Sequence, residues 1–149
     1  MKHKFRIAVD FDGTLCEECW PKIGLPNKAL IKWLIEKRKE GCYIILWTLR
    51  ENCIDLNDDF IPLLYDAIDW CKDRGLEFDK VNEFIHYQAY GYTPRKFPAE
   101  MYIDDRSFNP TLNIEYNPHG SLELQLELFY LRAKKRFKNS MEKMGLDYE

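Results

Sequence analysis

Residues 7–15 read IAVDFDGTL, an apolar run that breaks off into aspartates and a glycine. The apolar part begins slightly earlier, so residues 5–9 are expected to form a short buried strand. Gly13 lets the chain turn sharply as it leaves that strand, because glycine adopts backbone conformations that other residues avoid. The stretch therefore predicts a strand whose carboxyl end presents Asp10 and Asp12.

Other apolar runs predict further strands. Residues 42–47 read CYIILW and are rich in β-branched and aromatic side chains. Residues 101–103 form a shorter run, and residues 81–85 are expected to add one more strand. Helix signals lie between these runs, and strands that alternate with helices favour an α/β fold with a parallel sheet.

Two helices are predicted between the strands. Asn27 is a candidate N-cap for a helix that carries an apolar stripe and stops at Gly41. A second helix is expected from Phe60 to Gly75, with Pro62 in its first turn, where the missing N–H of proline is tolerated.

The C-terminal part of the chain fits two patterns. Four leucines occupy every second position from 122 to 128, as in a strand. A helical stripe is also visible at Leu122, Leu126, Phe129, Ala133 and Phe137. We favour a helix, because residues 129–144 are rich in helix formers. The chain is expected to form a single domain that spans residues 1–149. Within it, residues 107–149 are a C-terminal extension that packs on the rest of the domain.

Polar side chains follow three of the predicted strands. They are Asp10 and Asp12, then Thr48 and Arg50, and then Asp104, Asp105 and Arg106, with Lys96 shortly before the last strand. Ligands of parallel α/β sheets bind outside the carboxyl ends of the strands. We therefore expect these groups to gather at one edge of the sheet.

A cluster of this composition suits phosphoryl transfer. Crowded carboxylates need a cation among them, and oxygen donors without His or Cys favour Mg²⁺. The cation, Lys96 and the Thr48 hydroxyl would neutralise charge on the transferring oxygens. One aspartate can attack phosphorus, and a second carboxyl can protonate the leaving group and then activate water.

These motifs resemble those of the haloacid dehalogenase superfamily. The match consists of residues 7–15, the strand end ILWT at residues 45–48, Lys96, and MYIDD at residues 101–105. The resemblance implies a three-layer, Rossmann-like parallel sheet with helices on both faces. Cap domains of this superfamily are inserted after the first motif or between the second and third motifs. Neither segment of this chain shows a separate cap, so no sizeable cap domain is expected.

The resemblance also implies a role for each aspartate. Asp10 is expected to be the nucleophile and a Mg²⁺ ligand. Asp12 is expected to be the general acid and base, with its backbone carbonyl on the metal. Asp104 completes the metal site together with Asp105, which binds directly or through water. The presence of Asp12 favours a phosphatase over a dehalogenase, whose reaction needs neither that acid nor the metal.

Four further residues are expected to contact the phosphate. The resemblance implies that Thr48 holds the phosphoryl oxygens and that Lys96 binds both phosphate and the nucleophile. Arg50 and Arg106 flank the site, and arginine suits bidentate phosphate contact. Paired aspartates followed by arginine are also similar to the phosphatase domain of polynucleotide kinase-phosphatases, which removes 3′ phosphates.

The sequence thus predicts a Mg²⁺-dependent phosphatase that hydrolyses a phosphomonoester through an aspartyl-phosphate. A nucleotide, a sugar phosphate, a phosphoprotein or a nucleic-acid 3′ end are all open as the substrate. The net charge of −3 disfavours tight binding along a nucleic-acid backbone. The alternative is a phospho-accepting or ligand-binding module without efficient turnover. The order of the motifs disfavours a receiver-like module, and the filled catalytic positions disfavour a loss of catalysis.

The five cysteines and the hydropathy bear on the compartment. No secretory leader and no apolar stretch of membrane-spanning length is seen, so free thiols in the cytoplasm are expected. Cys16 and Cys19 have the spacing of a metal or redox pair, but no second pair or His partner accompanies them.

Overall fold

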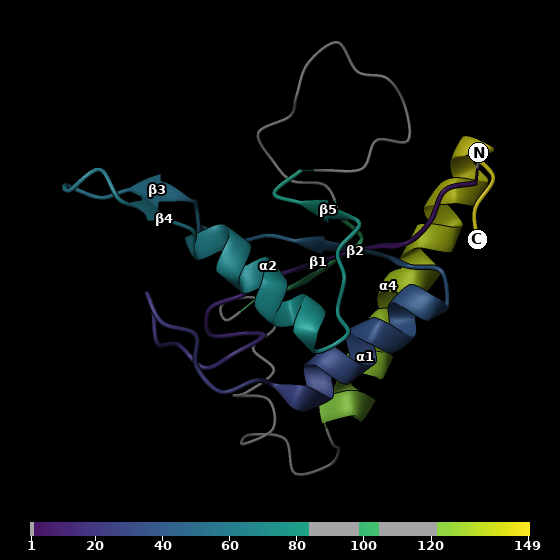
Figure 1. The fold of residues 1–149 in the computed structure, drawn as a ribbon. Coiled ribbons are helices and arrows are strands. Elements are labelled where there is room, and N and C mark those ends of the chain that lie inside the picture. Colours follow the sequence, from purple (N-terminus) through teal and green to yellow (C-terminus); the bar gives the residue numbers. More distant parts are fainter. Residues whose placement is uncertain (1, 84–98, 105–121) are drawn as a thin grey trace.

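A parallel sheet lies at the centre of the computed structural model, which describes residues 2–83, 99–104 and 122–149 (Figure 1). Its strands in spatial order are β5 (Lys80–Val81), β2 (Tyr43–Leu46), β1 (Arg6–Val9) and β6 (Met101–Ile103). All neighbouring pairs are parallel. The predicted α/β fold with a parallel sheet is confirmed, and helices flank the sheet.

The register of the sheet brings three strand ends to one level. Val9 of β1 lies opposite Leu46 of β2 on one side and Ile103 of β6 on the other. Just beyond these pairs, the N–H of Trp47 donates to the carbonyl of Val9 at 2.8 Å. The N–H of Asp10 donates to the carbonyl of Ile103 at 2.9 Å. The residues that leave β1, β2 and β6 therefore start side by side.

Helix α1 (Lys28–Lys39) begins and ends as predicted. The side chain of Asn27 accepts a hydrogen bond from the N–H of Leu30 at 3.2 Å, which caps the first turn. Gly41 follows the helix with a φ of 106°, a value that favours glycine. The buried apolar residues of α1, which include Leu34, belong to the hydrophobic core.

The prediction that the second helix starts at Phe60 was wrong. Helix α2 runs over Leu63–Asp73, and Pro62 is its N-cap. The carbonyl oxygen of the Asn52 side chain accepts from the N–H groups of Leu64 and Tyr65, both at 3.1 Å. The first turn is thus capped from a residue ten positions before the N-cap, which a local reading of helix signals does not detect.

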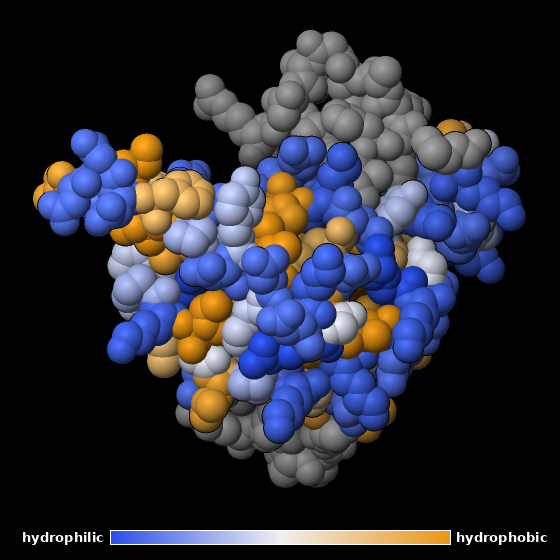
Figure 2. Space-filling view, viewed as in Figure 1, coloured by the Kyte–Doolittle hydropathy of each residue, from blue (hydrophilic) through white to orange (hydrophobic). Residues whose placement is uncertain are grey.

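Phe60 belongs instead to a hairpin that the sequence reading missed. Strand β3 (Cys53–Ile54) pairs antiparallel with β4 (Phe60–Ile61), and the hairpin projects from the body of the molecule (Figure 1). Figure 2 shows hydrophobic and hydrophilic residues side by side on this projection. Ile54, Leu56 and Phe60 are all exposed there. In the sequence, the hairpin follows β2 and precedes α2. In space, it lies on the side of the sheet where β2 ends (Figure 1).

The strand predicted over residues 81–85 is shorter in the structure. Strand β5 covers only Lys80–Val81, and Asn82 follows with a φ of 51°, which ends the extended conformation. Residues 84 and 85 lie outside the described residues.

The predicted C-terminal helix is confirmed as α4 (Leu122–Met144). Its buried stripe includes Tyr130 and Phe137, whose rings make T-shaped contacts with Phe5 at centroid distances of 5.1 and 5.7 Å. Tyr130 also meets Trp33 of α1 at 5.9 Å. Helix α4 therefore packs against both the start of β1 and α1. Among the described residues, no helix combines the length and apolar character needed to cross a membrane.

A charged contact joins α4 to α1. The ammonium group of Lys37, which is 4% exposed, donates to Glu127 at 2.9 Å, and the indole N–H of Trp33 donates to the same carboxylate at 3.0 Å. Burial alone would lower the pKa of Lys37, but its hydrogen bonds to Glu127 and Glu40 outweigh burial and raise it. For Glu127, burial would raise the pKa, but the hydrogen bonds from Lys37 and Trp33 outweigh burial and lower it.

We expect Glu127→Gln to lower the free energy of unfolding by about 1–2 kcal/mol at pH 7, because Lys37 loses a charged partner at a partly exposed site. A depressed carboxyl pKa stabilises the fold above the ordinary glutamate pKa, and this contribution disappears as the pH falls through the folded-state value. Urea unfolding at pH 7 and pH 3 should therefore show a smaller difference between variant and native chain at pH 3. Glu123→Gln, at an exposed position of the same helix, is the matched control. A loss that is equal at both pH values would contradict the role assigned to the pair.

Candidate active site

A pocket of about 560 Å³ opens at the carboxyl ends of β1, β2 and β6. Its lining residues are Asp10, Asp12, Glu18, Trp20, Trp47, Thr48, Leu49, Arg50 and Asp104. The structure thus brings together five of the eight residues that the sequence singled out. The other three, Lys96, Asp105 and Arg106, lie outside the described residues.

Asp10 is held where β1 ends. Its Oδ1 accepts a hydrogen bond from the N–H of Phe11 at 2.8 Å, which limits rotation of the carboxylate. The chain then turns back, because the N–H groups of Thr14 and Leu15 donate to the carbonyl of Phe11 at 3.2 and 3.0 Å. Gly13 has a φ of 78° in this turn, as the sequence predicted. The tight turn keeps Asp12 near the strand end.

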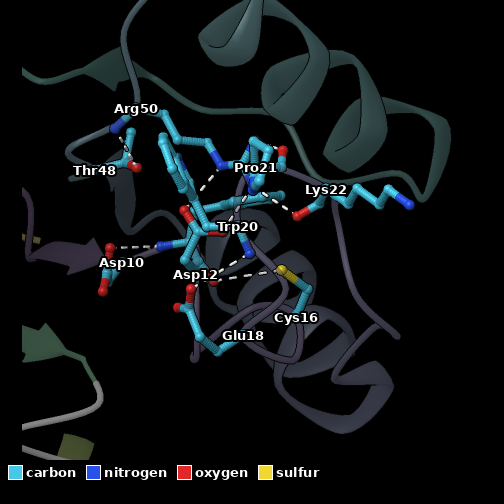
Figure 3. A network of polar contacts seen from close by, with 10 residues as sticks. Asp10, Asp12, Cys16, Glu18, Trp20, Pro21, Lys22, Thr48 and Arg50 are labelled. Carbon is cyan, nitrogen blue, oxygen red and sulfur yellow. Dashed lines mark hydrogen bonds and ion pairs between the residues drawn. The ribbon is translucent and has the colours of Figure 1, made fainter.

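Asp12 is bound by Arg50 across both carboxylate oxygens (Figure 3). The Nε of Arg50 donates to Oδ2 at 2.8 Å and Nη2 donates to Oδ1 at 2.7 Å. The guanidinium also donates to the carbonyls of Pro21 at 3.2 Å and Lys22 at 3.0 Å. It lies 5.0 Å from the centre of the Phe11 ring. Arg50 thus ties the loop after β1 to Asp12.

The guanidinium of Arg50 is buried among protein acceptors, unlike that of an arginine that is open to bind phosphate. Arg50 is only 2% exposed, and Nε, Nη1 and Nη2 all donate to protein acceptors. The hydrogen bonds to Asp12 outweigh burial and raise the pKa of Arg50 further. The phosphate contact expected of Arg50 stays a prediction, whereas the contact that the structure gives it is a bidentate one to Asp12.

Thr48 lies between these groups at the end of β2. Its N–H donates to Oδ1 of Asn82 at 2.8 Å, and its Oγ1 accepts from the N–H of Arg50 at 3.1 Å. A hydroxyl that accepts one hydrogen bond still has its own proton to donate. Thr48 is therefore oriented by the backbone and can donate to an oxygen of a ligand in the pocket.

The described lining is acidic. It holds four carboxylates, at Asp10, Asp12, Glu18 and Asp104, and one basic side chain, Arg50. Because Arg50 is committed to Asp12, an anion entering this part of the pocket would meet mainly negative charge. A phosphate therefore needs a further cation, from a metal ion or from residues beyond the described ones.

The donors present fit Mg²⁺. Within the described ranges, no three His, Cys, Asp or Glu side chains lie close enough together to hold a metal ion. The predicted ligand set does not require three such side chains there, because Asp12 is expected to contribute its backbone carbonyl and Asp105 lies outside these ranges. Asp10 and Asp104 leave neighbouring strands at the same level and both line the pocket. Carboxylate and carbonyl oxygens are the ligands that Mg²⁺ prefers.

Cys16 and Cys19 do not form a disulfide bond with each other. Cys16 is buried and Cys19 is exposed, and both are free cysteines. Burial raises the pKa of Cys16 to about 11, so its thiol stays protonated at neutral pH. The structure adds no support for a metal or redox role of this pair.

A conserved protein from Bacteroides thetaiotaomicron has a solved structure similar to this chain. The TM-score is 0.57, the sequence identity is 31%, and the match covers 79% of this chain and 94% of the Bacteroides protein. The chain belongs to the same family as this protein. No protein-family model matches the chain, and no curated protein matches it.

Membership of the Bacteroides protein's family shows the fold of this chain. It does not identify an activity, which has to be inferred from the residues of the site. That protein is described only as conserved, so nothing about a substrate follows from it. The resemblance to the haloacid dehalogenase superfamily, which rests on the motifs of this chain, stays a prediction.

The pocket also contains residues that the sequence reading missed. Trp47 and Leu49 flank Thr48, so their position just beyond β2 was a usable signal for a place at the same edge. Glu18 and Trp20 lie in the loop between β1 and α1, which has no periodicity that would point them at the strand ends. These four side chains form much of the pocket wall.

Proposed function

We propose that the protein is a Mg²⁺-dependent phosphatase that takes the phosphoryl group of a phosphomonoester onto Asp10 and then hydrolyses the aspartyl-phosphate. The observation that carries the proposal is the convergence of Asp10, Thr48 and Asp104 from three adjacent strand ends on one pocket. The proposal includes the three-layer, Rossmann-like core of the haloacid dehalogenase superfamily without a sizeable cap.

Binding and attack involve Thr48 and Asp10. The Thr48 hydroxyl donates to a phosphoryl oxygen, since its own oxygen already accepts from the N–H of Arg50. Asp10, Asp104 and the main-chain carbonyl of Asp12 would hold Mg²⁺, which would supply positive charge to offset the negative charge of the phosphoryl group. Asp10, whose Oδ1 accepts from the N–H of Phe11, supplies the attacking carboxylate.

Asp12 moves the protons in both steps. In the first, the bond from Asp10 to phosphorus forms, the bond from phosphorus to the ester oxygen breaks, and Asp12 gives that oxygen a proton. In the second, Asp12 takes a proton from a water molecule that attacks phosphorus, which releases phosphate and restores Asp10. Each carboxyl oxygen has two acceptor positions, so the two hydrogen bonds from Arg50 leave room for the proton.

Hydrolysis of p-nitrophenyl phosphate by the native chain, with and without Mg²⁺, tests the proposal. We expect turnover with Mg²⁺, less than about one hundredth of that rate in excess EDTA, and full recovery when Mg²⁺ exceeds the chelator. Turnover that is undiminished in EDTA would contradict the proposal. Stable transfer of a radiolabelled phosphoryl group to the chain without release of phosphate would favour the alternative, a phospho-accepting module.

A further inference from the structure

The pocket has two chemically different parts. The strand ends provide Asp10, Thr48 and Asp104. The rest of the wall includes three large apolar side chains, Trp20, Trp47 and Leu49, which are 59%, 39% and 100% exposed. Large apolar side chains gathered beside a polar cluster are typical of a surface that binds a ligand. An isolated phosphate would use none of them.

Trp47 forms a fixed wall next to the predicted phosphate position. Its backbone N–H donates to the carbonyl of Val9, and its ring makes a T-shaped contact with Tyr102 at a centroid distance of 5.5 Å. Thr48 is the next residue in the chain. A flat group attached close to the phosphate would therefore reach the Trp47 ring, and aromatic side chains bind flat rings by stacking.

Trp20 also lines the pocket, and it belongs to the loop after β1, where Figure 3 shows it close to Asp12 and Arg50. Its neighbour Pro21 accepts a hydrogen bond from Arg50, which in turn holds Asp12. The same guanidinium therefore fixes both the general acid and the backbone that carries Trp20. Two tryptophans on separate, anchored segments give a ring-binding wall beside the catalytic aspartates.

The charge of Glu18 indicates which kind of ring the pocket would prefer. Glu18 lines the pocket and is exposed, and its Oε1 accepts from the N–H of Trp20 at 3.4 Å. Its carboxylate keeps further acceptor positions, which can receive the amino group of a ring. A volume of about 560 Å³ lies within the range of pockets that hold whole small-molecule ligands.

We propose that the substrate is a nucleoside monophosphate with an amino-bearing base, which stacks on Trp20 and Trp47 and donates its amino hydrogens to Glu18. This inference rests on the proposed phosphatase activity for its chemistry, and on the exposed tryptophans and Glu18 for its specificity. Sugar phosphates without a base lack the stacking contact, and phosphotyrosine has a ring but no amino group on it.

Competition against p-nitrophenyl phosphate hydrolysis tests the inference. We expect cytidine 5′-monophosphate to have an inhibition constant at least about 10-fold below that of ribose 5-phosphate, because stacking on an aromatic side chain is lost without the base. It should also bind more tightly than uridine 5′-monophosphate and O-phosphotyrosine. Equal constants for cytidine 5′-monophosphate and ribose 5-phosphate would overturn the inference, and tighter binding of phosphotyrosine would overturn its assignment to a nucleobase.

Single substitutions separate the contributions of Trp20, Trp47 and Glu18 to ligand binding. In Trp47→Ala and in Trp20→Ala, the ratio of the two inhibition constants should shrink about 10-fold. In Glu18→Gln, the preference for cytidine over uridine should disappear. Leu131→Ala, at an apolar position on α4 whose 53% exposure lies between those of Trp47 and Trp20, is the matched control and should leave both ratios unchanged. Ratios that stay native in both tryptophan variants would overturn the inference.

The failure of the inference can be told from the failure of the phosphatase. If p-nitrophenyl phosphate is not hydrolysed, the proposed function fails, and calorimetric titration of the native chain in Mg²⁺ with the same compounds then tests the ring site alone. If it is hydrolysed but a base adds no affinity, the phosphatase stands and the substrate class assigned here is wrong.

Discussion

Asp10→Asn is expected to lower kcat for p-nitrophenyl phosphate by at least about 10³-fold, because an amide oxygen cannot replace a carboxylate as the attacking nucleophile. The substitution keeps the size and shape of the side chain. An asparagine oxygen can still accept from the N–H of Phe11, so the turn after β1 should be preserved. The expected loss is therefore one of chemistry and not of folding.

Turnover in saturating Mg²⁺, together with urea unfolding, checks this expectation. Asp69→Asn, which removes an exposed carboxylate from α2, is the matched control and should keep native kcat and native stability. A retained kcat above about one tenth of the native value in Asp10→Asn would mean that another group attacks phosphorus.

Arg50→Ala is expected to have the largest effect on stability. The side chain is almost completely buried and binds Asp12 and two backbone carbonyls. Removing one partner of a buried ion pair lowers the free energy of unfolding by about 3–5 kcal/mol. That is a large part of the total stability of an ordinary domain, about 5–15 kcal/mol, so this variant can fail to fold.

Arg50→Lys keeps the charge and tests the catalytic consequence in a chain with a better chance of folding. Lysine cannot make two parallel hydrogen bonds to Asp12 and also reach the loop carbonyls, because its ammonium is a single point of contact. We expect kcat to fall by about 10²-fold, within the range that general acid–base catalysis contributes. The measurement is kcat against pH, alongside urea unfolding.

A double-mutant cycle decides whether Arg50 acts through Asp12. If Arg50 positions Asp12, then Arg50→Lys should add little to the loss of kcat in a chain that already carries Asp12→Asn. Independent, additive losses would instead point to direct contact between Arg50 and the substrate, which is the role that the sequence alone suggested.

Local signals predicted much of the fold and the position of the site. The strands around residues 7, 44 and 102 are short apolar runs, and Asn27 and Gly41 bound α1 as expected. Asp10, Thr48 and Asp104 come together because each follows a strand of one parallel sheet, so the motif order alone indicated their neighbourhood.

Contacts distant in sequence account for what could not be predicted. The start of α2 depends on Asn52, and the backbone of Thr48 depends on Asn82. The pairing of Arg50 with Asp12 joins residues 38 positions apart, and nothing local to Arg50 marks it as a structural arginine. The hairpin β3–β4 came from a stretch where Phe60 fitted the helical spacing of α2 equally well.

The central claim is that the phosphoryl group passes through Asp10, and trapping that intermediate tests it most directly. The native chain is mixed with radiolabelled p-nitrophenyl phosphate and Mg²⁺, quenched in acid within the first turnover, and digested for peptide mapping. We predict label on the peptide that contains Asp10, released by hydroxylamine as expected of an acyl phosphate. Turnover without any labelled peptide, or label on a peptide that lacks Asp10, would contradict the claim.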